Sequence, residues 1–289
     1  VQTGLVALAT FMPQGIASPV GGLLADRYDR RKVFALTLVM QAVATGILAT
    51  ALGFGVRTPG VLTALILLSA AAGALGQPSY TAMQPDLVEP EELMAMISLV
   101  TYSWNSGRVI GPLLGTVLAL AVGPAWTVAF NAVSFLVLAT AVSLLRRPFR
   151  THGGSDGSIG ERLKGGWRAL WATPGCAHTV RVLIVLNFLV IPFMGLIPIY
   201  ARAEFHGGTG LAGSMASAQG VGSLLGGMTI TVLASHFRRS SLLALVVVLM
   251  SVMRALYGLA PDAGWVVAAS VVLGAASSAT IISCATVLQ

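Results

Sequence analysis

The stretch that decides the fold is GGLLADRYDRRK, residues 21–32, in which six of twelve residues are charged although long apolar runs stand on both sides. A charge cluster between two apolar runs is typical of a short loop at a membrane surface that joins two spanning helices. The stretch therefore predicts a membrane protein, and the composition of the whole chain can test this.

The composition favours lipid as the solvent of this chain. Apolar residues make up 56% of the 289 residues and charged residues 9%, whereas a soluble domain carries about 25% charged residues. One soluble core could not hide this much apolar surface. The net charge of +7 does not indicate nucleic-acid binding, because the basic residues lie in short loops and form no basic face.

Nine apolar segments follow along the chain, each near or above the ~20 residues that cross a bilayer as a helix. The period-two alternation of a membrane barrel is absent, and Leu, Ala and Gly dominate, so we expect an all-α membrane protein with nine transmembrane helices. The segments are Val1–Ala25, Val33–Leu52, Gly60–Met83, Ile97–Val122, Pro124–Leu145, Val180–Tyr200, Leu211–Ser235, Ser241–Ala260 and Trp265–Leu288.

The distribution of Lys and Arg predicts the orientation. Twelve basic residues lie in the loops after the first, fifth and seventh segments, and only Arg57 and Arg202 lie in loops on the opposite side. The positive-inside rule places the first group in the cytoplasm of a multi-pass inner (plasma) membrane protein. The twelve are Arg27, Arg30, Arg31, Lys32, Arg146, Arg147, Arg150, Arg162, Lys164, Arg168, Arg238 and Arg239.

The longest loop, residues 146–177, is basic and contains Gly and Ser, which is typical of a cytoplasmic linker between two bundles. We expect an N-terminal bundle over residues 1–145 and a C-terminal bundle over residues 178–289. Five segments precede the loop and four follow it. If each half has six, the chain is expected to be a fragment that lacks the first helix and the last two of twelve.

The motif in the opening stretch has a physical interpretation. Gly22 and Asp26 are four residues apart and share one helix face, where Gly22 would let another helix approach closely. Arg27, Arg30 and Arg31 continue into the loop. A second, acidic stretch that contains Asp86 lies in the next cytoplasmic loop, which has no basic residue.

Six plus six helices, a basic central loop and the pattern Gly22-x-x-x-Asp26-Arg27-x-x-Arg30-Arg31 resemble the major facilitator superfamily. The pattern resembles its signature between the second and third helices, with Asp29 where Gly is frequent. This numbers the two bundles as family helices 2–6 and 7–10. The resemblance implies a gating motif of Gly22, Asp26, Arg27, Arg30, Arg31 and Asp86, and the alternative is that the arginines only set topology.

A second motif lies in the fourth segment, where Gly107, Gly111, Pro112 and Gly115 form a row of small residues with a proline. The row predicts close helix packing. It resembles the fifth-helix motif of drug–proton antiporters in the superfamily, although Ser98 and Thr116 stand where Gly is usual. The alternative is an ordinary packing seam.

Further matches resemble the enterobactin-exporter and macrolide-efflux branch, namely the stretches 84–91, 105–112, 198–202 and 207–210. This branch implies a secondary-active, proton-coupled exporter of small amphipathic molecules such as drugs or siderophores, working as a monomer in the bilayer without a cofactor. No carboxylate lies deep in a segment, so proton coupling is implied by the resemblance alone.

Polar residues inside the segments are costly in lipid and face the bundle interior. The set is Gln14, Gln41, Gln77, Asn105, Arg108, Asn131, Asn187, Gln219 and Arg254. Thr101, Asn105 and Arg108 share one face of the fourth segment. By family helix number, the candidate cavity residues are Gln77, Thr101, Asn105, Arg108 and Asn187. Arg108 falls near the bilayer midplane.

Other functions stay open at this point. A lysophospholipid or nutrient transporter of the same superfamily, or a non-transporting or decayed membrane protein, would have a similar pattern. A membrane enzyme is disfavoured, because no HExxH, GxSxG or phosphate-binding loop appears and the four His lie in loops or at segment ends. The two cysteines have no metal-ligand spacing.

Overall fold

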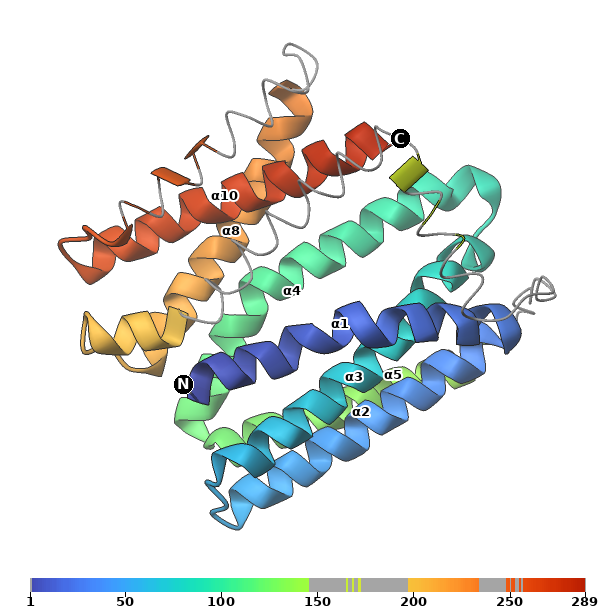
Figure 1. Cartoon of the computed structure of the whole chain (residues 1–289), viewed down its shortest axis with the longest axis horizontal. Helices are drawn as coiled ribbons and strands as arrows, with labels where there is room; N and C mark the ends of the chain where they lie inside the picture. The colour runs from blue at the N-terminus through green and yellow to red at the C-terminus, as the bar shows by residue number, and fades with distance from the viewer. Residues whose placement is uncertain are drawn as a thin grey trace. The chain divides into compact units, whose positions relative to one another are not determined.

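A computed structural model describes residues 2–145, 197–233 and 257–288, together with positions 165, 168, 171–172, 248–249, 251–252 and 255. All regular structure in these residues is helical (Figure 1), in agreement with the all-α membrane fold expected from the sequence. The elements are α1 (Gln2–Arg27), α2 (Arg30–Gly53), α3 (Pro59–Met83), two short 3₁₀ turns η1 (Gln84–Leu87) and η2 (Pro90–Glu92), α4 (Leu93–Ala121), α5 (Pro124–Ser143), α8 (Thr209–Leu233) and α10 (Ala263–Leu288). Residues 197–203 are helical as well.

Local chemistry sets the helix boundaries. Asp29 caps α2, because its side chain accepts a hydrogen bond from the Arg31 N–H at 2.9 Å. This accounts for Asp29 at a motif position where the family often has glycine. The boundary expected at Gly123 and Pro124 is confirmed: Gly123 adopts φ of 87°, which glycine tolerates, and Pro124 is the first residue of α5.

The contacts divide the chain into two compact units. Unit 1 contains residues 1–100 and 117–159, and unit 2 contains residues 101–116 and 160–289. The middle of α4 therefore groups with unit 2, which differs from the expected N-terminal bundle over residues 1–145. That expected division, with its central loop over 146–177, stays a prediction, since most of the loop lies outside the described residues.

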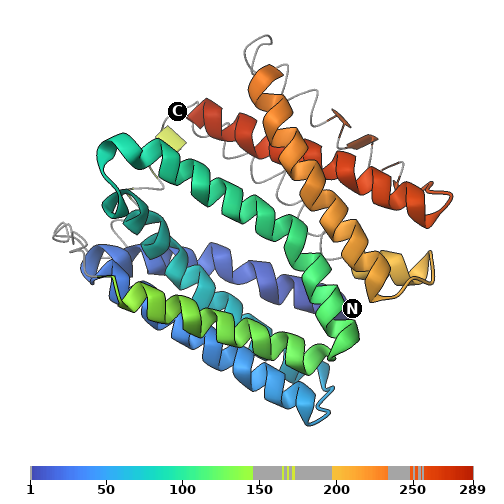
Figure 2. The same cartoon turned by 180° about the vertical axis from the view of Figure 1, so that it is seen from behind.

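Unit 1 is built on α2, which packs against both α3 and α5, while α1 packs against α3. Figures 1 and 2 show α2, α3 and α5 side by side from opposite directions. In unit 2, α8 packs against α10. They approach closely at Gly222 and Gly226 of α8 and at Gly274 of α10, where an added Cβ would meet the backbone of Val271, Ala275 and Gln219 respectively.

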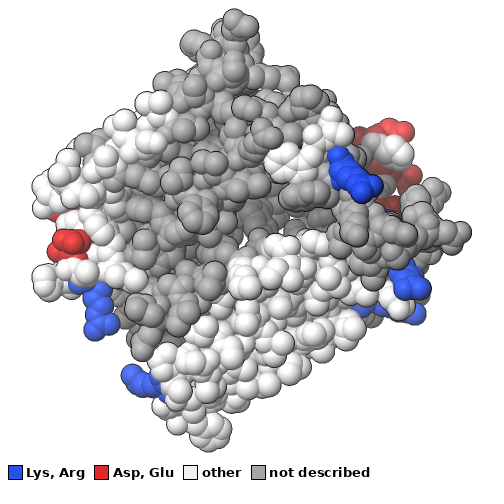
Figure 3. All heavy atoms as spheres, viewed as in Figure 1, with Lys and Arg blue, Asp and Glu red and all other residues white. Residues whose placement is uncertain are grey.

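Small side chains fill the interior and large apolar ones face outward. Most buried apolar residues of unit 1 are alanines, whereas Leu36, Leu120 and Phe130 are exposed. In the face of unit 1 that Figure 3 shows, basic side chains lie at the ends and the surface between them is uncharged. Among the described residues, α2, the stretch 59–87 and α5 are long and apolar enough to cross a membrane. This is the pattern of helices packed in lipid.

The α2–α3 hairpin is joined by a ladder of contacts, one between aromatic rings and three between small or polar side chains. Thr45 and Ser69 hydroxyls lie 3.2 Å apart, and a Cβ on Gly76 would lie 2.2 Å from Thr37 Oγ1. The helices run antiparallel, so the residue numbers of successive partners decrease along α3 as they increase along α2. The four rungs are Phe34–Tyr80, Thr37–Gly76, Gln41–Gly73 and Thr45–Ser69.

Candidate functional site

The first candidate site is the basic cluster, defined as Arg27, Arg30 and Arg31. Arg30 Nη1 lies 3.4 Å from Asp86 Oδ2 and 3.0 Å from the Ala82 carbonyl oxygen, and Arg30 Nε lies 3.4 Å from the Ala25 carbonyl oxygen. Side-chain exposure is 12% for Arg30 and 26% for Asp86. One guanidinium at the start of α2 therefore holds the ends of α1 and α3 and the acidic loop.

Arg31 makes a similar contact with the end of α5. Its Nη1 donates to the carbonyl of Leu145, just past the end of α5. Its Nη2 lies 3.9 Å from the capping carboxylate of Asp29. Because the last carbonyls of a helix lack donors and carry partial negative charge, Arg30 and Arg31 satisfy the ends of α1, α3 and α5.

An apolar cluster lies one turn further along α2 and supports these contacts. Phe34 and Leu38 pack with Met83 of α3 and with Ala139 and Val142 of α5. All five side chains are buried. The ends of α2, α3 and α5 are thus joined by an apolar layer and by charged hydrogen bonds from Arg30 and Arg31.

The other members of the predicted gating motif are placed as follows. Asp26 is half-buried and Arg27 is exposed. Among described atoms nothing comes within 4 Å of a Cβ added to Gly22, whereas one added to Gly21 would lie 2.3 Å from the Leu75 carbonyl oxygen. The close approach of α1 to α3 therefore falls one residue before the predicted glycine.

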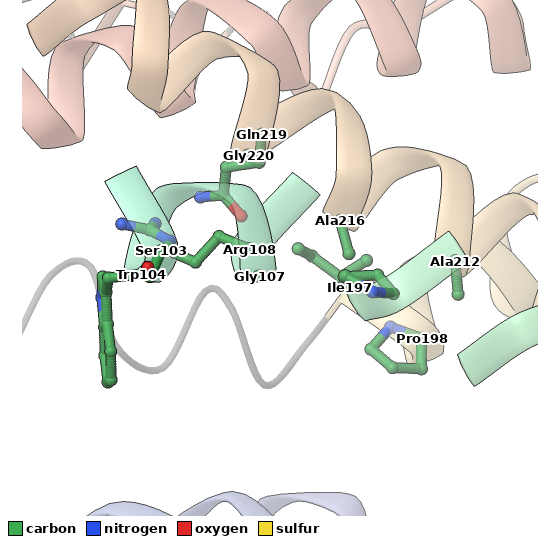
Figure 4. A pocket seen from close by; sticks show the side chains of 11 residues that line it. Ser103, Trp104, Gly107, Arg108, Ile197, Pro198, Ala212, Ala216, Gln219 and Gly220 are labelled. Atoms are coloured by element: carbon green, nitrogen blue, oxygen red, sulfur yellow. The ribbon is translucent and has the colours of Figure 1, made fainter. Parts of the chain in front are cut away.

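The second candidate site is a pocket of about 520 Å³ in unit 2, here named the α4–α8 pocket. Its α4 wall has a four-residue repeat, Trp104, Arg108 and Pro112, which places these side chains on one helix face. The opposite wall comes from α8 and from helical residues 197–198. The described lining residues are Ser103, Trp104, Gly107, Arg108, Pro112, Ile197, Pro198, Ala212, Ala216, Gln219 and Gly220 (Figure 4).

Two glycines of α8 allow the pocket walls to meet. A Cβ on Gly213 would lie 2.1 Å from Thr116 Oγ1, and one on Gly220 would lie 2.5 Å from the Arg108 carbonyl oxygen. Pro112 has no N–H, so it leaves that same carbonyl, four residues earlier, without its helical donor. Gly220 directs a Cα hydrogen towards this freed oxygen, which is a weak but favourable contact.

Arg108 and Gln219 are the polar side chains that converge at the pocket. Figure 4 shows the Gln219 carboxamide pointing from α8 towards the turn of α4 that carries Arg108, whose guanidinium extends towards Ser103 and Trp104. Gln219 is 5% exposed and Arg108 is half-buried. Within the described residues, neither side chain has a hydrogen bond or an ion pair. The pocket therefore combines one cation and one amide with mostly apolar walls.

The predicted cavity residues do not all gather here. Arg108 lines the pocket, but Thr101 and Asn105 do not, and the Asn105 amide instead donates to the Thr101 carbonyl at 3.0 Å. Gln77 is exposed on α3 of unit 1, and Asn187 lies outside the described residues. A cavity role for these four stays a prediction.

The glycine row of α4 also differs from its expected role. Gly107 and Pro112 line the pocket. No described atom comes within 4 Å of a Cβ added to Gly107, Gly111 or Gly115. Where α4 meets α8, the glycines that permit the approach belong to α8, because the α4 side contributes Thr116 and the Arg108 carbonyl.

Sequence reasoning missed Ser103 and Trp104 as pocket residues and gave no such role to Gln219. Trp104 stands four residues before Arg108, and this spacing could have identified it. The run of glycines at 213, 220, 222 and 226 was a further signal for close packing on α8. Which α8 residues face Arg108 depends on the crossing of two helices about a hundred residues apart, which no local pattern encodes.

Long apolar helices with charged residues at their ends indicate an integral membrane protein. The chain belongs to the transmembrane secretion effector family, whose model matches residues 1–289. Family and fold are those of the major facilitator superfamily of transporters, in agreement with the resemblance inferred from the motifs.

Curated relatives include exporters. The chain is 33% identical over 151 residues to the enterobactin exporter of Citrobacter koseri, an alignment that covers 51% of this chain and 36% of the relative. It is 22% identical over 265 residues to macrolide efflux protein A of Streptococcus pyogenes, covering 90% of this chain and 65% of that protein. The aligned regions thus span about one third to two thirds of these relatives' lengths.

Solved transporters share the fold at low identity. The D323A mutant of the nucleoside transporter NupG matches with a TM-score of 0.74 and 15% identity, covering 98% of this chain and 72% of that one. A D-xylose–proton symporter matches with a TM-score of 0.69 and 15% identity, covering 96% of this chain and 70% of that one. At this identity the likeness concerns the fold alone.

Proposed function

We propose that the chain belongs to a secondary-active exporter of small amphipathic molecules, coupled to protons and working by alternating access. The α4–α8 pocket is the proposed cargo site, and the Arg30–Asp86 contact is the proposed cytoplasmic gate. The observation that carries the proposal is the pocket itself, where a cation near the middle of α4 lines a space of ligand size. The exporter relatives support the outward direction.

The proposed gate follows from the contacts of Arg30. It bonds the ends of α1 and α3 and the Asp86 carboxylate, so these elements form one block when the contacts are made. A conformational change that opens this end of the helices must break an ion pair that is largely sheltered from water. A charged contact of this kind can separate two discrete states.

The test is transport in everted membrane vesicles that contain the full-length protein. Labelled erythromycin and labelled enterobactin serve as probes, because the relatives' names indicate these two cargo types. We expect accumulation of at least one probe on energisation and its loss when a proton uncoupler is added. Asp86→Asn should reduce accumulation at least tenfold at equal protein level, since it removes the charge that faces Arg30.

Glu91→Gln is the matched control, because it neutralises an exposed carboxylate in the same loop. It should accumulate the probe as the wild type does. Wild-type accumulation by Asp86→Asn would contradict the gate. Probe movement in the opposite direction would favour an importer, and no energised movement of either probe would contradict the exporter as proposed.

A further inference from the structure

The α4–α8 pocket contains a cation without a described counter-charge. Arg108 is the charged residue among the eleven described lining residues, and none of these eleven is a carboxylate. Across the described parts of the chain, no ion pair involves Arg108. A guanidinium is always charged at physiological pH and presents donors in a planar fork that matches a carboxylate.

The depth of Arg108 argues against a lipid headgroup as its counter-ion. α4 runs from Leu93 to Ala121, so Arg108 stands fifteen residues after the first residue and thirteen before the last. At ~1.5 Å per residue this is about 20 Å from either end of the helix, which is close to the middle of a ~30 Å hydrocarbon core when α4 spans the bilayer as the sequence predicts. A headgroup would have to leave the interface to reach it, whereas a small solute in the pocket would not.

Gln219 adds a second, independent indication of a ligand. The residue is buried, with an exposed fraction of 5%. Its carboxamide points towards the Arg108 turn (Figure 4), and no described atom hydrogen-bonds to it. The carboxamide therefore has its hydrogen-bonding capacity available at the pocket, and a bound polar group between α8 and α4 would give it a partner.

The other lining residues indicate the size and polarity of the uncharged part of a ligand. Ile197, Pro198, Pro112 and Ala216 offer apolar contact. Trp104, one turn before Arg108, adds a flat aromatic surface at the same face of α4. A volume of about 520 Å³ holds a molecule of one or a few rings.

We infer that the α4–α8 pocket binds a small organic anion with a flat apolar body, its anionic group on Arg108 and Gln219 and its body against Trp104 and the apolar wall. The inference rests on the proposed function only in treating the occupant as cargo. It distinguishes anionic cargo from neutral and cationic molecules of the same shape, which the exporter proposal by itself does not.

The experiment is calorimetric titration of the full-length protein in phosphatidylcholine nanodiscs, whose headgroups carry no net charge. The probes are 2-naphthoate, its neutral isostere 2-naphthamide, and the cation 2-naphthylmethylammonium. The wild type should bind 2-naphthoate about tenfold or more tightly than either of the others, because a charge-assisted bidentate contact is available only to the carboxylate.

Variants assign this preference to the site. Arg108→Gln should weaken 2-naphthoate binding about tenfold and leave 2-naphthamide binding within about threefold, whereas Arg108→Lys should keep part of the preference because it keeps the charge. Gln219→Leu should weaken 2-naphthoate binding while retaining the preference over the cation. Arg57→Gln, exposed in the α2–α3 loop of the other unit, is the control and should bind as the wild type does.

Equal binding of the three probes, preference for the cation, or no binding of 2-naphthoate would overturn the inference. An unchanged preference in Arg108→Gln would overturn it as well. The two proposals can fail separately. Anion-selective binding without energised efflux would contradict the exporter alone, and energised efflux by a protein without anion preference would contradict the anion site alone.

Discussion

Arg30 and Arg108 lie in two regions of the molecule that treat the same side chain in opposite ways. Arg30 sits at a helix start, with a carboxylate and two helix-end carbonyls within 3.4 Å. Arg108 sits at the middle of a helix, with no hydrogen bond or ion pair in the described parts of the chain. The Arg30 guanidinium has its Nε and Nη1 donors engaged within the protein, whereas the Arg108 guanidinium has donors available. The comparison teaches that an arginine's partners, more than its presence in an apolar chain, separate a structural or gating role from a binding role.

Labelling tests whether the end of the helices that carries Arg30 faces the cytoplasm, as the gate proposal requires. Cysteine placed at Glu91, in the loop beside the Arg30 contacts, should react only from the cytoplasm, and cysteine at Thr209, at the start of α8, only from outside. Both positions are exposed. The effect is all or none in intact cells treated with an impermeant maleimide, after Cys176 and Cys284 have been replaced by Ser. The reverse pattern would invert the orientation and remove the cytoplasmic gate.

The Arg108 region depends on α8 lying against the α4 backbone, so the next test changes Gly220. Gly220→Ala places a Cβ 2.5 Å from the Arg108 carbonyl oxygen, where backbone has to move. We expect a loss of about 1–3 kcal/mol in stability, the usual range for overpacking, together with loss of 2-naphthoate binding. Thermal unfolding in nanodiscs and calorimetry provide the two measurements.

Gly111→Ala is the matched control on α4, where no described atom lies within 4 Å of the added Cβ. It should leave unfolding unchanged or raise the midpoint slightly, because alanine is favoured over glycine inside a helix by about 0.5–1 kcal/mol. If Gly111→Ala destabilises the protein more than Gly220→Ala does, the close contact lies on the glycine row of α4 after all.

The next variants separate two roles of Arg30, namely its ion pair with Asp86 and its hydrogen bonds to two helix-end carbonyls. Arg30→Gln should reduce transport at least tenfold at equal protein level, whereas Arg27→Gln, which changes an exposed arginine of the same cluster, should transport nearly as the wild type. Exchanging the partners as Arg30→Asp with Asp86→Arg should not restore transport, because the carbonyls of Ala25 and Ala82 would then face a carboxylate. Full rescue by the exchange would show that the ion pair alone matters.

The smallest expected effect belongs to a neutral contact of unit 1, and it sets the scale for the charged ones. Thr45 and Ser69 hydroxyls lie 3.2 Å apart between α2 and α3. A double-mutant cycle of Thr45→Val and Ser69→Ala should give a coupling of about 0.6 kcal/mol, the average for hydrogen bonds between membrane helices. The same cycle for Arg30→Gln and Asp86→Asn provides the comparison. Equal coupling energies for the two pairs would remove the distinction between charged and neutral contacts.

The sequence predicted what depends on local spacing and composition. The boundary at Gly123 and Pro124 follows from the sequence, and the apolar content follows from the count of charges. The start of α2 was predicted at Val33, whereas the helix begins at Arg30 after the Asp29 cap. The attraction between Arg30 and Asp86 was predictable because two neighbouring loops on one membrane side carry opposite charges. Arg108 was identified as a candidate because a charge in the middle of an apolar segment is costly.

What could not be predicted depends on how separate helices cross. Gln77 and Asn105 are as polar as Gln219, yet the pocket includes only Gln219, because the rotation of α8 towards α4 places it there. Gly21 rather than Gly22 meets α3, a difference of about 100° around the helix that a motif with two adjacent glycines cannot resolve. Long-range rotation and register decide such cases, and they are properties of the packed bundle.

The ladder between α2 and α3 has a consequence for how this chain enters a membrane during synthesis. Thr45 alone would bring a hydroxyl into hydrocarbon, but its partner Ser69 follows within the next helix, after a connection of only five residues, 54–58. The two helices can therefore leave the insertion machinery as a preassembled pair, with small side chains already in contact. Biogenesis of the first unit would then proceed by hairpins, and each polar rung would be shielded before the later helices are translated.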